Sequence, residues 1–250
     1  MSVAADDLKA CCAAAYSTAA ARFLLGDSFH PGGNVLTAEL GAALGVGPGN
    51  TVVDVASGPG TSALQIARET GCDVIGVDLA PPPDRPDEPR VRFLVGDAEA
   101  LPLDEASVDG ALCECALCTF PDKARAASEL ARVLRPGARL ALSDMTADRA
   151  QLPEELTGLH AWVACVADAR PLAEIAALLA EAGFAVERAQ QRDHLLDELL
   201  ARVDARLQVA AMLEDIVSSE AAATGRSLVT AARRAIDDGV LGYGVVIARR

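Results

Sequence analysis

The stretch Val52-Val53-Asp54-Val55-Ala56-Ser57-Gly58-Pro59-Gly60 joins a short apolar run to a glycine-rich turn, and the apolar residues after the turn have helical spacing. Glycines at such a turn let the backbone bend tightly and approach a ligand closely. In open α/β sheets, ligands bind at the carboxyl ends of the strands, near the point where the strand order reverses. This stretch therefore predicts a ligand-binding turn at the end of the first strand of an α/β sheet.

The rest of the chain alternates short apolar runs with helical patterns. Strands are predicted at residues 51–55, 73–78, 91–95, 108–113, 138–143, 184–189 and 242–248. Helices are predicted at residues 34–44, 122–134 and 171–182, with one or two more within 2–25 and two amphipathic ones within 194–238. Pro136-Gly137 is expected to stop the helix at 122–134. Strands that alternate with helices imply βαβ units and a parallel sheet covered on both faces.

The composition excludes several classes of partner. The 250 residues contain 22 Lys and Arg against 36 Asp and Glu, a net charge of −14, and such a chain repels nucleic acid and anionic membranes. Aromatic residues make up only 3%, too few for base-stacking platforms. Asp6 and Asp7 stand where a secretory signal needs positive charge, and no apolar run is long enough to span a membrane, so we expect a cytoplasmic protein.

Acidic residues follow three successive predicted strands. Asp54 lies in the first, Asp78 ends the second, and Asp97-Ala98 follows the third. An acid at these places can accept ribose hydroxyls or an adenine amino group, and no phosphate-binding lysine is present, which fits a nucleoside without phosphates. The alternative is a nucleotide-binding dehydrogenase, but the third glycine of its GxGxxG motif is replaced by Ala63.

Four segments in order resemble the class I S-adenosylmethionine-dependent methyltransferases over about residues 35–190: VVDVASGPG (52–60), GVDLA (76–80), FLVGDAEALPL (93–103) and ELARVLRPGARLALSD (129–144). The resemblance implies a Rossmann-like, seven-stranded, doubly wound α/β sheet with an antiparallel last strand, and S-adenosylmethionine as cofactor. The sequence has no internal repeat and no low-complexity linker, so we expect one domain over 1–250: an N-terminal helical lid at 1–48, a cofactor-binding core at 49–190, and a helical insertion with the last strand at 191–250.

The same resemblance assigns the expected cofactor contacts. Those at the methionine end are Asp54, Ala56 (where the family more often has glycine), Ser57, Gly58 and Gly60. Asp78 and Leu79 would contact the ribose, Asp97 and Ala98 the adenine, and Tyr16 would belong to the lid. Glu114 and Cys115, just after the fourth strand, would line the methyl-transfer site.

The run CECALCTFPDKARAASELARVLRPGARLALSDMTADR (113–149) is similar to the corresponding stretch of arsenite methyltransferases. That resemblance implies that Cys115 and Cys165 bind arsenic, and the N-terminal Cys12 is a candidate for a third thiolate. Thiolates are soft ligands that favour soft metals and metalloids. By strand alternation, Cys113 and Cys115 would share a face if the strand continues that far.

Two alternatives stay open. The acceptor is the oxygen, nitrogen or carbon of a small natural product, with His30 or Glu114 as the catalytic group, or the protein is a non-catalytic metalloid-binding protein on the same fold. The partners expected are a small molecule or metalloid, with no nucleic acid and no membrane. The arginine-rich helices of 194–238 have solvated faces or form a homodimer contact.

Overall fold

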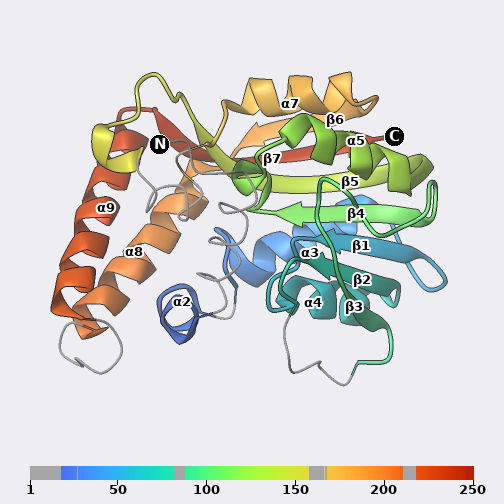
Figure 1. The fold of residues 1–250 in the computed structure, drawn as a ribbon, viewed down its shortest axis with the longest axis horizontal. Coiled ribbons are helices and arrows are strands. Elements are labelled where there is room, and N and C mark those ends of the chain that lie inside the picture. The colour runs from blue at the N-terminus through green and yellow to red at the C-terminus, as the bar shows by residue number, and fades with distance from the viewer. Residues whose placement is uncertain (1–17, 27, 82–87, 158–165, 167, 211–217) are drawn as a thin grey trace.

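The computed structural model describes residues 18–26, 28–81, 88–157, 166, 168–210 and 218–250. Its centre is a seven-stranded sheet with the order β3-β2-β1-β4-β5-β7-β6 (Figure 1). The strands are β1 (Thr51–Val55), β2 (Asp73–Asp78), β3 (Val91–Val95), β4 (Val108–Glu114), β5 (Leu134–Ala147), β6 (Ala185–Gln191) and β7 (Leu241–Arg249). The neighbours from β3 to β5 are parallel, and β7 is antiparallel to both β5 and β6, which confirms the predicted fold class.

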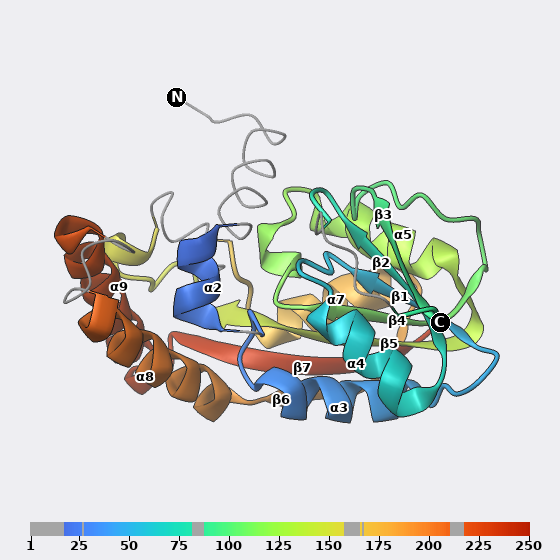
Figure 2. The ribbon, with the colours of Figure 1, turned by 90° about the horizontal axis from the view of Figure 1, so that it is seen from below.

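Helices cover both faces of the sheet (Figure 2). On one face lie α3 (Gly33–Leu44), which contacts β4 and β5, and α4 (Thr61–Thr70), which contacts β2 and β3. On the other lie α5 (Lys123–Val133), against β5, and α7 (Leu172–Glu181), against β6 and β7. Two separate hydrophobic clusters result, one under each pair of helices.

The remaining helices gather beyond the carboxyl ends of the parallel strands (Figures 1 and 2). They are α2 (Ala19–Leu25), α8 (Asp193–Ala210), α9 (Ser219–Asp237) and the short helices η1 (Leu117–Thr119) and η2 (Glu154–Leu156). The predicted insertion before the last strand is formed by α8 and α9, which pack on each other. Arg206 of α8 donates to the carbonyl oxygen of Leu24 at 2.9 Å and so ties α2 to the insertion. Within the described residues, no helix is long and apolar enough to cross a membrane.

The expected stop at Pro136-Gly137 is wrong. The helix α5 ends at Val133, and β5 begins with the next residue, so both positions lie inside the strand. The sheet tolerates them because the register between β4 and β5 shifts there: Leu134 pairs with Val108, but Arg139 already pairs with Gly110. Such a bulge is a place where a strand accepts proline and glycine.

Candidate active site

Acidic side chains follow the carboxyl edge of the sheet in the order of its strands. Asp97 follows β3, Asp78 ends β2, Asp54 lies within β1, and Glu114 ends β4. The strand order reverses between β1 and β4, so this edge contains the switch point at which open α/β sheets bind ligands. The acids that the sequence singled out are therefore brought together.

Asp54 is a buried carboxylate without a full set of partners. It is 3% exposed, and its Oδ2 atom has no hydrogen-bond partner in the described part of the chain. Burial raises the pKa of Asp54 well above its usual value, and the neighbouring carboxylates of Glu114 and Asp78 raise it further. A positively charged ligand group would relieve both effects.

Asp78 braces the glycine turn. Its Oδ2 atom accepts the N–H of Gly58 at 2.9 Å, and its Oδ1 atom accepts the N–H of Ala80 at 2.8 Å. The Gly58 amide is therefore taken by the protein's own side chain, while each carboxylate oxygen of Asp78 keeps a lone pair that a ribose hydroxyl can use. The neighbouring Leu79 is 41% exposed.

The turn after β1 depends on left-handed backbone at alternate positions. Ala56, Gly58 and Gly60 have φ of 58°, 50° and 82°. A Cβ atom on Gly58 would meet no described atom within 4 Å, so this residue borders open space, whereas one on Gly60 would lie 2.7 Å from Cε1 of the buried Phe93. The two glycines therefore have different tasks, one at a ligand surface and one at a packing contact.

These features fit a positively charged nucleoside. Asp54 Oδ2, near the end of β1, and the hydroxyl of Ser57, in the turn that follows, are both buried without a partner among the described residues. Buried polar atoms normally have a hydrogen-bond partner, so two unsatisfied atoms this close in the chain indicate a place where a ligand binds. On the other flank, Asp97 is positioned by the Glu99 N–H, which its Oδ1 accepts at 2.9 Å, and Ala98 is buried beside it.

Glu114 is the centre of a polar network that joins four segments. It is 4% exposed on its side chain, and Ser62 of α4 donates to its Oε2 atom at 2.6 Å. Thr37 of α3 lies 3.1 and 3.2 Å from its two oxygens. His30, in the loop before α3, has its Nε2 atom 3.5 Å from Oε2 and its Nδ1 atom 3.1 Å from the carbonyl oxygen of Pro31. The structure thus brings together Glu114 and His30, the two groups proposed for acid–base work.

Cys115 directly follows β4 with φ of +51°, a left-handed conformation that is uncommon outside glycine. Its N–H donates to the carbonyl oxygen of Ser143 at 2.7 Å. The Ser143 hydroxyl accepts a hydrogen bond from the phenol O–H of the fully buried Tyr243 at 2.9 Å. The strand β4 ends at Glu114, so the condition for a shared face of Cys113 and Cys115, a strand that continues to Cys115, is not met. Cys115 packs against the cluster on the α3–α4 side, and Cys113 lies in the opposite cluster.

The described cysteines differ in exposure. Cys115 is partly exposed, whereas Cys72, Cys113 and Cys118 are buried. Burial, followed by the nearby carboxylate of Asp144, raises the pKa of Cys113 well above the usual thiol value. Cys115 is therefore the best-placed thiol of the four for chemistry. The other residues predicted for the site, Tyr16, Cys12 and Cys165, lie outside the described residues.

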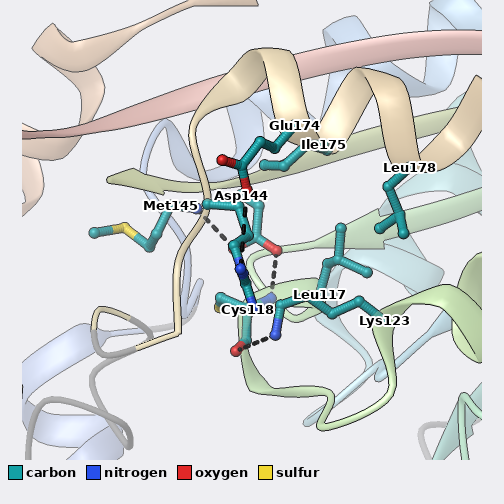
Figure 3. Close-up of a pocket in the computed structure, with 9 residues that line it drawn as sticks. Leu117, Cys118, Lys123, Asp144, Met145, Glu174, Ile175 and Leu178 are labelled. Atoms are coloured by element: carbon teal, nitrogen blue, oxygen red, sulfur yellow. Dashed lines mark hydrogen bonds and ion pairs between the residues drawn. The ribbon is translucent and has the colours of Figure 1, made fainter. Parts of the chain in front are cut away.

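A cavity of about 250 Å³ lies beside the loop after β4 (Figure 3). Figure 3 shows Glu174 and Ile175 of α7 on one side and Leu117, Cys118 and Lys123 on the other. Asp144, which also lines the cavity, is 1% exposed and accepts the N–H of Cys118 at 2.8 Å.

Lys123 holds this loop to the segment before α7. Its Nζ atom is within hydrogen-bond distance of the carbonyl oxygens of Cys118 (3.2 Å) and Phe120 (2.9 Å) and of Asp168 Oδ2 (2.5 Å). Arg149 also pairs with Asp168, at 2.7 Å. Sequence reasoning missed this ion pair and the hydroxyls around Glu114. The signal for the ion pair was Lys123 itself, one of only two lysines in the chain.

Comparison with known proteins shows what this site is similar to. Residues 53–142, from β1 into β5, match the methyltransferase domain family. The matched range contains Asp54, Asp78 and Glu114 of the carboxyl edge.

Relatives of the methyltransferase domain differ in what they methylate. The chain is 37% identical over 153 residues to an arsenite methyltransferase of Halobacterium salinarum, covering 55% of this chain and 38% of that protein. It is 32% identical over 164 residues to the O-methyltransferase resE of Aspergillus sclerotiorum (60% and 61% covered) and 33% identical over 170 residues to the methyltransferase GfsG of Streptomyces halstedii (63% and 61%). The chain thus spans between 38% and 61% of the length of these three relatives.

Solved structures agree with the methyltransferase fold. The phosphoethanolamine N-methyltransferase 2 of Haemonchus contortus, in complex with S-adenosyl-L-methionine, is similar with a TM-score of 0.77 and 20% identity, over 92% of this chain and 56% of that one. The cyclopropane synthase MmaA2 of Mycobacterium tuberculosis is similar with a TM-score of 0.79 and 18% identity, over 100% and 99%.

Proposed function

We propose that the protein is an S-adenosylmethionine-dependent methyltransferase whose acceptor is As(III) held by the thiols of Cys115 and Cys165. One observation carries the proposal: Cys115 is a partly exposed thiol directly after Glu114, the last residue of β4. The strand β4 is the neighbour of β1, which leads into the glycine turn. The similarity to an arsenite methyltransferase over 153 residues supports the same acceptor.

The Lys123 ammonium supports the pairing of these two cysteines. Cys118, whose carbonyl oxygen lies 3.2 Å from Lys123 Nζ, follows Cys115 by three residues. Asp168, whose Oδ2 atom is 2.5 Å from the same ammonium, follows Cys165 by three residues. The two cysteines of the proposed pair therefore each precede a partner of this ammonium by the same distance in the sequence. A trivalent metalloid needs two or three sulfurs at one place.

The chemistry asks little of the protein beyond alignment. Bound S-adenosylmethionine supplies a methyl group on a positively charged sulfur. Thiolates that bind As(III) leave its lone pair free, so the new As–C bond forms as the S–C bond breaks, and no general base is needed. The contribution of the chain is to hold the reacting atoms about 3–3.5 Å apart and in line.

A second candidate acceptor is a hydroxyl or amine of a small natural product. The observation that favours it is the buried contact of 3.5 Å between His30 and Glu114, which resembles the pairing of a general base with its orienting acid. The O-methyltransferase among the relatives is consistent with it.

The test is product analysis with matched cysteine variants. We expect the wild-type protein to convert S-adenosylmethionine to S-adenosylhomocysteine only when arsenite is present, with a methylated arsenical detected by mass spectrometry. Cys115→Ser and Cys165→Ser should each abolish this conversion, and Cys72→Ser, which removes a buried thiol at the start of β2, should keep it.

The other outcomes separate the alternatives. Unchanged turnover in both serine variants would refute the thiol-bound acceptor. Turnover of a hydroxyl or amine compound that His30→Gln abolishes would establish the second candidate. Arsenite that protects the thiols from alkylation, without any consumption of the cofactor, would identify a metalloid-binding protein and not an enzyme.

A further inference from the structure

Three carboxylates share one face of the sheet at its carboxyl edge. Asp54 of β1 pairs with Gly76 of β2 and with Leu112 of β4. Asp78 and Glu114 lie two residues beyond those partners, so by strand alternation their side chains are on the face of Asp54. Asp78 and Glu114 therefore flank Asp54 on either side, one step nearer the edge. We call Asp54, Asp78 and Glu114 the acid row.

No lysine or arginine in the described part of the chain pairs with the acid row. Among the described residues, the side chains in contact with Glu114 are the hydroxyls of Ser62 and Thr37 and the imidazole of His30, whose Nε2 atom is 3.5 Å away. Asp78 accepts backbone N–H groups, and Asp54 has an oxygen with no partner in the described part of the chain. Two of the three carboxylates are almost fully buried, where charges act strongly on one another.

We infer that Glu114, with Asp54, is a specificity-determining residue that makes the site hold the charged methyl donor in preference to its demethylated product. The donor has a positively charged sulfur, and S-adenosylhomocysteine has a neutral thioether in its place. Methyl transfer thus removes one unit of positive charge from a site built to attract it, and the acid row favours release of the product. The inference rests on the cofactor and not on the proposed acceptor.

The hydrogen bonds around Glu114 fix the position of its carboxylate. Ser62, at the start of α4, donates to this carboxylate at 2.6 Å and holds it near the turn after β1. Thr37 and His30 hold it from α3 and the preceding loop, so the charge cannot rotate away to solvent. Glu114→Gln removes the charge and keeps the shape and much of the hydrogen bonding.

The experiment is isothermal titration calorimetry of three ligands without any acceptor: S-adenosylmethionine, S-adenosylhomocysteine, and sinefungin, which has a protonated amine where the donor has its sulfonium methyl. We expect the wild-type protein to bind S-adenosylmethionine and sinefungin more tightly than S-adenosylhomocysteine. Glu114→Gln should lower the affinity ratio of donor to product about tenfold, the effect of one screened charge at close range.

Asp97→Asn is the matched control, because Asp97 is expected at the uncharged adenine. It should weaken donor and product by the same factor and leave their ratio unchanged. An unchanged ratio in a folded Glu114→Gln variant, or sinefungin affinities that follow those of S-adenosylhomocysteine, would overturn the inference. If Glu114→Gln does not fold, Asp54→Asn gives the same test. Failure of all three ligands to bind would remove the cofactor assignment and the inference with it, whereas failure of arsenite methylation alone would leave both standing.

Discussion

Gly58 and Gly60 both have left-handed backbone, yet alanine at each should have a different effect. Alanine in this conformation costs about 1–2 kcal/mol of folding free energy at either position. At Gly58 that is the whole structural cost, because the added Cβ atom would meet no described atom within 4 Å. At Gly60 the Cβ atom would also press on the ring of Phe93, which is 4% exposed and cannot move freely.

The magnitudes follow from adding the packing cost to the backbone cost. Overpacking a core site costs about 1–3 kcal/mol, so Gly60→Ala should cost about 2–5 kcal/mol in total. In a protein of 250 residues, each 1 kcal/mol lowers the melting temperature by about 2–4 °C. Cofactor binding should show the reverse order. The Cβ atom of Gly58→Ala enters the space next to the acid row, so this variant should lose at least about tenfold in affinity for S-adenosylmethionine, the factor that 1.4 kcal/mol of lost contact corresponds to.

Two measurements check this pair: thermal unfolding followed by circular dichroism, and calorimetric titration with S-adenosylmethionine. We expect Gly60→Ala to be the less stable variant and Gly58→Ala to be a folded protein with weakened binding. If Gly58→Ala bound the cofactor with wild-type affinity, the placement of the ligand against this turn would be refuted. Equal melting temperatures for the two variants would refute the packing argument.

Further predictions concern stability and thiol reactivity. The pKa of Asp54 is raised in the folded protein, so the native state binds a proton more tightly than the unfolded state does. The free energy of unfolding therefore falls as pH rises above the unfolded pKa of this group. Asp54→Asn should raise the melting temperature at pH 7, and this gain should vanish in acid. Asp168→Asn should cost about 3–5 kcal/mol in urea unfolding, since it leaves the ammonium of Lys123 buried and unpaired. Lys123→Met should cost only about 2 kcal/mol of unfolding free energy, because it leaves two carbonyls without a donor while arginines still pair with Asp168. A larger loss for Lys123→Met than for Asp168→Asn would contradict this reasoning. Alkylation of the native protein, read by peptide mass spectrometry, should label Cys115 well before Cys113, and equal rates would be incompatible with their difference in burial.

Much of the fold was predictable from the sequence because its signals are local. Short runs of valine and isoleucine bounded by glycine mark buried parallel strands, and β1 and β2 have the predicted bounds. The bounds of β5 were missed because a bulge lets proline and glycine stay in a strand, and a bulge depends on the partner strand. The acids at the strand ends were found for the same reason as the strands: their position follows from the strand itself.

The rest of the site depends on tertiary structure that a single sequence does not show. Ser62 and Thr37 belong to two different helices, and only the packing of α3 and α4 on one face brings them to Glu114. The orientation of Cys115 depends on a left-handed residue after a strand, a conformation that its side chain does not favour and that Ser143 of the next strand stabilises.

The place of β7 between β5 and β6 makes the sheet independent of the segment that precedes this strand in the chain. Nine residue pairs fix the register of β7 against β5, and further pairs fix it against β6. The helices α8 and α9 lie between β6 and β7 in the sequence. We therefore expect a change in the length of these helices to leave the strands of Asp54, Asp78 and Glu114 in place.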